Sequence, residues 1–493
     1  MSGAIDEKFD QFIGGQSAPA SSGERRTLLN PANNQPLTSV AAGTIDDAHR
    51  AMEVADEAFR GSGWAGDDGA RRAKALYRLA RLLEEQAEAF ALTETLNMGK
   101  TIREARGDIG YVVRTVEYVA GLADKLQGET IPVPGSRLDY TIREPLGVTV
   151  HIAPWNYPLL LAVRSVAPAL AAGNAVVLKP ASLTPLTALK FARLAKDAGV
   201  PDGILNVVVG SGASVGEALV LDARCRSVSF TGSGDVGRRI AELAAQRCLP
   251  TTLELGGKSP VVVFPDADLD RAAKGIAFGV FGNAGQMCWA GSRLLVAEPV
   301  REELLQKVAQ IAKAYRIGPG NDPTTEIGPL VSRDQAERVL GFVAEARDAG
   351  ARVIVGGTRP EEPTLAEGNF VRPAVVTDVD PNARIVREEV FGPVLSVLSF
   401  STTEEAVRAA NDTRYGLFAS IWTKDLGTAH LVARQLDAGM VSVNEGPTTF
   451  PQTPFTGFKE SGVGFEQGME AIKVYTRRKN VMIQLGGGKP RKA

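Results

Sequence analysis

The sequence predicts an α/β fold built around parallel sheets. Short apolar runs alternate with segments of helical periodicity, which is typical of βαβ units. A chain of 493 residues is too long for one hydrophobic core, so we expect two or three domains. Five runs predict the first sheet: Val148–Ala153, Ala175–Lys179, Leu205–Val209, Ser227–Phe230 and Thr251–Leu255. Four more predict the second: Val261–Phe264, Leu294–Ala297, Val394–Phe400 and Val441–Val443.

Other segments are predicted to be helices or a hairpin. Apolar residues recur at helical spacing over Arg71–Leu92, which predicts one amphipathic helix. A second helix is expected with Thr184 as its cap and Pro185 at its first position. Arg238–Gln246 is expected to be a third helix, and residues 126–145 have the extended, proline-containing character of a protruding hairpin.

Composition excludes several classes of function. The net charge is −2 and acids and bases are interleaved, so no basic stripe indicates nucleic-acid binding. Met1–Asp10 lacks the apolar core of a secretion signal, and the apolar stretch Tyr157–Leu178 contains charge and proline, which disfavours a membrane span. Three cysteines without a secretion signal fit a reducing cytoplasm, where we expect the protein to act.

Histidine chemistry is not indicated. His49, His151 and His430 are far apart in the sequence, and their spacing suggests neither a zinc site nor a Ser-His-Asp triad. We therefore expect structural roles for these histidines and no bound metal.

The first chemical signal is the glycine-rich segment Gly232–Gly237, which follows a predicted strand and opens a predicted helix. Free N–H groups and the positive dipole end of a helix favour a pyrophosphate, so the segment favours a dinucleotide site. The alternative is an ordinary tight βα turn. On spacing alone, Glu254 would be the acid that binds the ribose hydroxyls.

Two further residues could carry chemistry. Small residues precede Cys288, and a helix or turn is expected after it; a helix N-terminus would stabilise its thiolate. A lone cysteine is more often a small buried residue, the reading we give Cys225 and Cys248. Asn156 follows a predicted strand, where its amide could donate to an oxyanion or simply form a turn.

Together these segments resemble the aldehyde dehydrogenase superfamily over nearly the whole chain. Each matching stretch is short, but their order is specific. The stretches are Pro154–Pro158, Lys179–Ala181, Phe230–Ser233, Leu253–Pro260, Gly285–Cys288, Glu388–Pro393 and Asn444.

The resemblance implies a role for each matching position. Cys288 matches the nucleophile, Glu254 the general base of thioester hydrolysis rather than a ribose acid, and Asn156 the oxyanion donor. Presence of an acid at Glu254 favours release of the free carboxylic acid over transfer to coenzyme A. The positions that match cofactor contacts are Trp155, Lys179, Ser182, Gly232, Ser233, Leu255, Glu389 and Phe391.

The resemblance also implies an aldehyde dehydrogenase-like architecture with two Rossmann-like domains. A cofactor-binding domain is expected over residues 1–122 and 146–256, and a catalytic domain over 257–460. Residues 123–145 and 461–493 are expected to form an oligomerisation hairpin with a C-terminal strand. Such enzymes are homodimers or homotetramers.

This sequence departs from the family pattern at two informative positions. Many members that prefer NAD carry Glu where Ser182 stands; because a carboxylate would repel a 2′-phosphate, Ser182 permits NADP as well as NAD. Arg164 is typical of members that bind a substrate carboxylate, but the second Arg of that subclass is replaced by Gly282. The alternative for Arg164 is a salt bridge that points away from the substrate.

The remaining substrate positions favour an apolar or aromatic wall around a small aldehyde. By position they are Tyr111, Tyr157, Arg164, Trp289, Phe450 and Phe455. Two other functions stay open at this point: a non-catalytic binding protein on the same fold, and a hydroxyl dehydrogenase of the ordinary Rossmann type.

Overall fold

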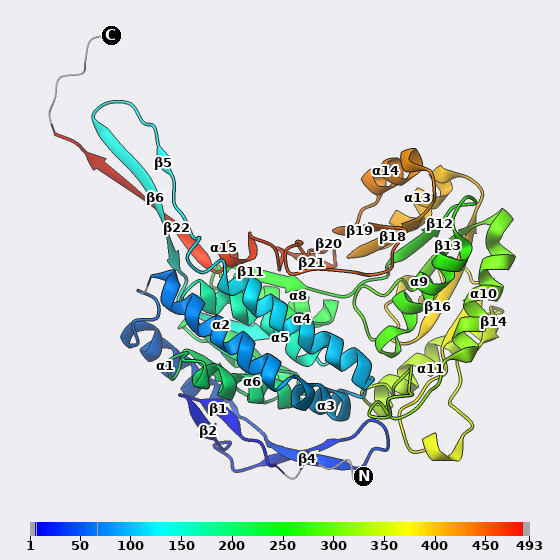
Figure 1. Ribbon diagram of the computed structural model, residues 1–493, viewed down its shortest axis with the longest axis horizontal. Helices are drawn as coiled ribbons and strands as arrows, with labels where there is room; N and C mark the ends of the chain where they lie inside the picture. The colour runs from blue at the N-terminus through cyan, green and yellow to red at the C-terminus, as the bar shows by residue number, and fades with distance from the viewer. Residues whose placement is uncertain (1–4, 6, 67, 487–493) are drawn as a thin grey trace.

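The computed structural model describes residues 5, 7–66 and 68–486, and the predicted α/β fold is confirmed. Two sheets lie side by side, each covered by helices, and a long arm projects from the first (Figure 1). The outermost parts of the predicted ranges 1–122 and 461–493, and much of the segment Met1–Asp10, lie outside the described residues.

The first sheet has the order β2-β1-β9-β8-β7-β10-β11-β21. Its five central strands are parallel, and β1 and β21 pair antiparallel at either side of them. All five predicted strands are present. The strands are β1 (Gln11–Ile13), β2 (Gln16–Ala18), β7 (Val148–Ile152), β8 (Ala175–Lys179), β9 (Leu205–Val207), β10 (Cys225–Thr231), β11 (Thr251–Glu254) and β21 (Gly462–Val463).

Helices cover both faces of this sheet. The helices α1, α7 and α8 lie on one face; α5 and α6 lie on the other, beneath an outer layer of α2, α3 and α4. Their bounds are α1 (Ile45–Gly61), α2 (Gly69–Glu85), α3 (Ala87–Met98), α4 (Ile102–Ala120), α5 (Pro158–Ala171), α6 (Leu186–Asp197), α7 (Glu217–Leu221) and α8 (Gly234–Ala245). A π-helical turn, Gly212–Gly216, precedes α7.

The strand order places a ligand crevice between β7 and β10. Strands β8 and β9 extend the sheet on one side of β7, whereas β10 and β11 extend it on the other. In an open parallel sheet, a crevice forms at the carboxyl ends of the strands where the order reverses. The loops that begin after Ile152 and Thr231 therefore face a common space.

The second sheet has the order β14-β15-β16-β13-β12-β18-β19 and is parallel except for β14. The helices α9, α10 and α11 pack on one face, and α13 and α14 pack on the other. The strands are β12 (Pro260–Val263), β13 (Arg293–Ala297), β14 (Arg352–Val355), β15 (Ala374–Thr377), β16 (Val394–Phe400), β18 (Phe418–Trp422) and β19 (Met440–Val443). The helices are α9 (Leu269–Phe281), α10 (Arg301–Ala314), α11 (Arg333–Asp348), α12 (Arg384–Arg387), α13 (Thr403–Asn411) and α14 (Leu426–Gln435).

The projecting arm is a three-stranded antiparallel sheet in the order β22-β6-β5. Its strands are β5 (Thr130–Ile131), β6 (Arg137–Pro145) and β22 (Thr476–Gln484), and the short helix α15 (Ala471–Val474) precedes β22. Residues 462–475 lie outside the arm, because β21 joins the first sheet and Ile472 and Tyr475 pack in its core. The predicted domain limits stay a prediction.

Two small antiparallel pairs complete the fold: β3 (Arg25–Leu29) with β4 (Pro36–Ala41), and β17 (Tyr415–Gly416) with β20 (Phe458–Lys459). No helix among the described residues is both long enough and apolar enough to span a bilayer. The apolar stretch Tyr157–Leu178 forms α5 and most of β8.

The structure corrects three predicted helices. The segment Arg71–Leu92 forms parts of two helices that meet at Gln86. Hydrophobic periodicity does not detect this break, because Leu83 before it and Phe90 after it are buried in the same core. Pro185 is the cap of α6 rather than its first residue, and Thr184 bonds to the Trp155 carbonyl instead (3.4 Å). The helix predicted from Arg238 begins earlier, at Gly234.

Candidate functional site

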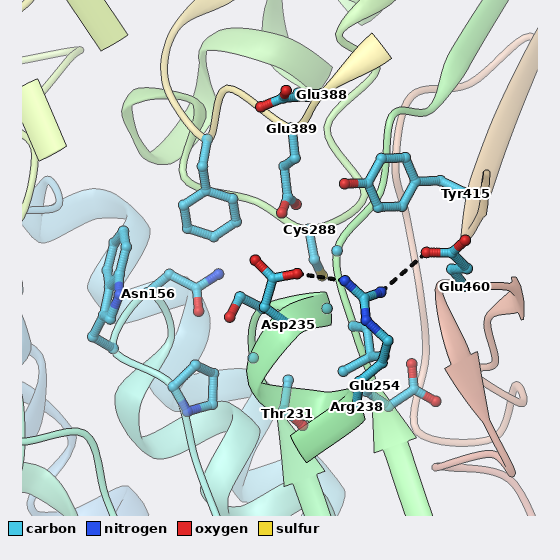
Figure 2. A pocket seen from close by; sticks show the side chains of 18 of the residues that line it. Asn156, Thr231, Asp235, Arg238, Glu254, Cys288, Glu388, Glu389, Tyr415 and Glu460 are labelled. Carbon is cyan, nitrogen blue, oxygen red and sulfur yellow. Dashed lines mark hydrogen bonds and ion pairs between the residues drawn. The ribbon is translucent and has the colours of Figure 1, made fainter. Parts of the chain in front are cut away.

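A cavity of about 400 Å³ lies where the carboxyl end of the first sheet meets the second sheet. Asn156 follows β7, Glu254 ends β11, and Cys288 lies on the loop between α9 and β13 (Figure 2). Residues distant in sequence therefore line one space. The other predicted residues on its wall are Trp155, Gly232, Ser233, Leu255, Glu389 and Phe391.

A strained turn presents Cys288. Asn283, Ala284 and Gly285 have positive φ angles of 49°, 52° and 74°. Such left-handed conformations cost a few kcal/mol together and persist only where surrounding contacts impose them. A Cβ at Gly285 would collide with the backbone of Gly392, so glycine is required there. The helix considered after Cys288 is absent, and no helix dipole supports its thiolate among the described residues.

Hydrogen bonds hold this turn against Asn156. The Asn283 amide donates to the Asn156 carbonyl (3.0 Å), and the Asn156 side-chain amide donates to the Gln286 carbonyl (2.9 Å). The Glu104 carboxylate accepts from the Asn283 N–H (2.7 Å). Because the Asn156 amide nitrogen carries two hydrogens, one remains for a bound oxygen.

The protonation states of the two central groups follow from burial. Burial raises the pKa of the Cys288 thiol to about 12, with a smaller opposing effect from Arg164. Burial, reinforced by the charge of Glu466, also raises the pKa of Glu254 well above its usual value. Both Glu254 oxygens are buried without a hydrogen-bond partner among the described residues. A water or substrate oxygen would supply the missing partner.

A second group of residues fits a nicotinamide dinucleotide. Ser233 caps α8 without a side-chain bond, so the first N–H groups of α8 face the cavity unshielded. A Cβ at Gly237 would collide with Leu255, so this glycine lets α8 pack closely on the segment after β11.

Lys179 and Glu389 are two of the predicted cofactor contacts, and of the two only Glu389 is part of the main cavity wall. The Lys179 ammonium is buried and donates a long hydrogen bond to the Pro180 carbonyl (3.4 Å). Burial lowers the pKa of Lys179 to about 8. Burial raises the pKa of Glu389 to about 7, and its carboxylate accepts from the Gly257 N–H (3.1 Å). An under-bonded buried cation suits ribose hydroxyls or a phosphate.

Phe391 contacts Trp155 edge-to-face, with 5.1 Å between ring centres. Phe391 has a φ of 57°, another left-handed residue at the site. Its carbonyl accepts from the side chain of Gln335 (2.8 Å), which fixes the ring against the cavity.

Ser182 lies away from the nucleophile, on a second cavity of about 770 Å³. Its hydroxyl donates to the Gly210 carbonyl (2.7 Å). Charged residues of both signs line this cavity: Arg26, Glu24 and Asp46.

The predicted substrate residues are only partly gathered. Trp289 and Phe455 have ring centres 5.4 Å apart, and the Arg164 guanidinium lies 4.1 Å above the Phe455 ring. Tyr157 is stacked under the Lys100 ammonium (3.9 Å), and the Tyr111 hydroxyl accepts from Gln467 (2.8 Å). The Phe450 side chain is 56% exposed, and none of the six predicted substrate residues is part of the main cavity wall.

Sequence reasoning missed several charged residues at the cavity. Arg238 bonds to Glu460 (3.1 Å) and forms a close ion pair with Asp235, so it bridges α8 and the β20–β21 segment (Figure 2). Both Asp235 and Arg238 stand in or beside the glycine motif, which could have identified them. Gln335, Arg338 and Arg414 carry no such signal.

Comparison with known proteins agrees with this geometry. The model of the aldehyde dehydrogenase family matches residues 18–481. The chain is 42% identical to hydroxyisobutyraldehyde dehydrogenase of Mycolicibacterium austroafricanum, over 96% of this chain and 93% of that protein. It is 41% identical to betaine aldehyde dehydrogenase of Bacillus subtilis (strain 168), over 95% and 96%.

A solved NAD-dependent aldehyde dehydrogenase from Sinorhizobium meliloti superposes with a TM-score of 0.96 at 39% identity, over 99% of this chain and 97% of that one. The chain therefore belongs to the aldehyde dehydrogenase family. Its reaction is the NAD-dependent oxidation of an aldehyde.

The raised pKa of Cys288 makes a testable prediction. A thiol with a pKa near 12 is almost wholly protonated at neutral pH, and alkylation requires the thiolate. In the cofactor-free enzyme, the rate of inactivation by iodoacetamide should rise about tenfold per pH unit from pH 6.5 to 9.5. A plateau below pH 8.5 would contradict the predicted protonation state. Cys225 is buried as predicted, but Cys248 is exposed, which corrects the expectation for that residue. Cys248 is therefore the matched control, since Cys248→Ser should inactivate at the same rate.

Proposed function

We propose that this enzyme releases a free carboxylic acid from a thioester on Cys288, with Glu254 as the base that activates water. The observation that carries the proposal is one cavity lined by a thiol, a side-chain amide and a buried, unpartnered carboxylate.

In the first step the Cys288 thiol loses its proton to water, and the resulting thiolate adds to the aldehyde carbon. Negative charge moves to the carbonyl oxygen, where the free hydrogen of the Asn156 amide and the backbone N–H of Cys288 can meet it. Losing one such donor typically costs about 10²–10³ in rate. The bound cofactor supplies the hydride acceptor. Trp155, Phe391 and Glu389 would orient it beside Cys288.

Hydrolysis then depends on Glu254. Oxidation leaves a thioester on Cys288, and a water must lose a proton to attack it. Glu254 has no competing hydrogen bond among the described residues, and burial raises its pKa well above the usual value. A raised pKa makes a carboxylate a stronger proton acceptor in this transfer.

Glu254→Gln should separate the two half-reactions. A burst of about one NADH per site should remain, because hydride transfer precedes hydrolysis, while steady turnover should fall about 10²–10⁴-fold. Stopped-flow absorbance at the NADH band measures both phases. Glu242→Gln, an exposed site on α8, is the control and should keep full turnover. A folded Glu254→Gln enzyme with neither burst nor turnover would refute the assigned division of roles.

We propose that the substrate is an uncharged aliphatic or aromatic aldehyde. Trp289 and Phe455 form an aromatic pair, and Trp289 directly follows Cys288 in the chain, so an apolar substrate group is favoured beside the nucleophile. Arg164 is already paired with the buried Glu466, so its charge is balanced without a substrate carboxylate. A carboxylate there would be a third acid near one guanidinium, after Glu254 and Glu466. The two relatives compared above are named for a neutral and a cationic aldehyde. Sequence identity to them therefore does not decide the charge of the substrate.

Three substrates of similar size test this proposal. We expect kcat/KM for butanal to exceed that for 4-oxobutanoate and for betaine aldehyde by at least about 100-fold, because burying either charged group costs far more than burying a propyl chain. A preference for 4-oxobutanoate would show that Arg164 leaves Glu466 to bind substrate.

We also propose that NADP is accepted alongside NAD. Ser182 places a hydroxyl, not a carboxylate, on the second cavity, and Lys179 offers a buried cation. A 2′-phosphate would therefore meet no repulsion from position 182 itself.

Ser182→Glu tests this cofactor proposal. The new carboxylate should lower kcat/KM for NADP at least about tenfold, the equivalent of roughly 1.4 kcal/mol, and leave NAD use in place. Ser22→Glu puts the same charge elsewhere on this cavity and should have a smaller effect. A wild-type preference for NAD above a hundredfold would contradict the proposal.

We propose that the protein forms a homodimer or homotetramer through the projecting arm. Apolar side chains stand exposed along it: Ile131, Leu138, Ile142, Met482, Ile483 and Leu485. A projecting sheet with such a surface is suited to burial against another copy. A cytoplasmic location stays a prediction from composition.

A further inference from the structure

Arg164 holds a buried charge in the middle of α5. Its Nε donates to the Glu466 carboxylate in a close ion pair, and both side chains are almost wholly buried. The guanidinium also stacks on the Phe455 ring at 4.1 Å. Its Nη2 is buried and has no hydrogen-bond partner among the described residues. One donor of a fixed guanidinium is therefore left free.

Glu254 has unused hydrogen-bond acceptors, whereas Arg164 has an unused donor group. Its side chain is 2% exposed, and both carboxylate oxygens lack a partner within the described part of the chain. Ser229, which bonds to Glu466, lies on β10 beside β11, and Glu254 is the last residue of β11, so the Arg164–Glu466 pair lies near this carboxylate. The positive charge of Arg164 lowers the pKa of Glu254, and the negative charge of Glu466 raises it. Glu466 itself accepts a bond from Ser229 (3.3 Å) besides Arg164. One guanidinium thus serves two buried carboxylates, of which only Glu466 is bonded to it.

We propose that Arg164 is a positioning residue shared by these two acids: Glu466 fixes its Nε, and its free Nη2 receives the Glu254 carboxylate between turnovers. The planar fork of arginine can serve two acceptors at once, which a lysine ammonium on a flexible chain does less well. The inference rests on the proposed function, in which Glu254 is the base. It adds that Arg164 favours the ionised form of the base, whereas Glu466 disfavours it.

Arg164 and Glu466 have opposite effects on the pKa of Glu254. Burial raises its pKa most, Glu466 raises it further, and Arg164 lowers it. Cys288 and Tyr475 also lie within electrostatic reach, but burial keeps both protonated at neutral pH. Removing Arg164 should raise the pKa of Glu254, whereas neutralising Glu466 should lower it.

Deacylation without cofactor measures this directly. The Cys288 thiolate attacks 4-nitrophenyl acetate, 4-nitrophenolate leaves, and an acetyl thioester remains on the sulfur. Water then adds as Glu254 takes its proton, and acetate and the thiolate are released. The pH midpoint of the deacylation rate reports the ionisation of Glu254. The reaction of Cys288→Ala supplies the background rate.

Two comparisons between variants separate the effect of Glu466 from that of Arg164. Glu466→Gln should move the midpoint to lower pH. Arg164→Met alone strands Glu466 as a buried, unpaired acid and can unfold the chain, so Arg164 is removed in the Glu466→Gln background. The double variant should have a midpoint at least about one pH unit above that of Glu466→Gln, the usual effect of losing a nearby opposite charge.

An unchanged midpoint in both comparisons, with native circular dichroism, would overturn the shared role of Arg164. So would a shift of Glu466→Gln to higher pH. Glu254→Gln separates this failure from failure of the proposed function. If Glu254→Gln deacylates at the wild-type rate, then Glu254 is not the base. If Glu254→Gln does not deacylate, and the pH midpoint is the same in wild type, Glu466→Gln and the double variant, only the role given to Arg164 is wrong.

Discussion

The whole site depends on two close approaches to the backbone of the segment that joins the two sheets. This segment, 255–259, leaves the carboxyl end of β11 and enters β12. A Cβ at Gly256 would collide with the Glu389 carboxylate, and one at Gly257 would lie 2.5 Å from the Cys288 carbonyl. Because both positions lack side chains, the nucleophile loop and the expected ribose acid can lie against the end of the strand that carries Glu254.

A second constraint is the exclusion of water from charged groups. Glu254, Glu466, Arg164 and Cys288 share a buried region, in which the electrostatic effect of each charge on its neighbours is larger than in water. Burial alone would favour neutral carboxyls and a neutral thiol. The single guanidinium is what opposes this tendency, so the reactivity of the site depends on how Arg164 divides its hydrogen bonds.

Regular periodicity revealed the parallel strands and the glycine turn, because buried strands and βα turns leave local patterns. The break at Gln86 and the turn before Cys288 left none: Ala284 has no sequence feature that marks a left-handed residue. The pairing of Arg164 with Glu466 joins positions 302 apart in the sequence, so no local motif could predict it. Resemblance identified the reacting groups, but not the charge that surrounds them.

The central claim is that the substrate becomes covalently attached to one sulfur before water is used. Intact mass and peptide mass spectrometry of Glu254→Gln, quenched in acid after mixing with NAD and butanal, test it most directly. The account predicts one butanoyl group per chain, located on the peptide that contains Cys288. Unmodified Cys288 despite formation of NADH, or an acyl group on Cys225 or Cys248, would contradict it.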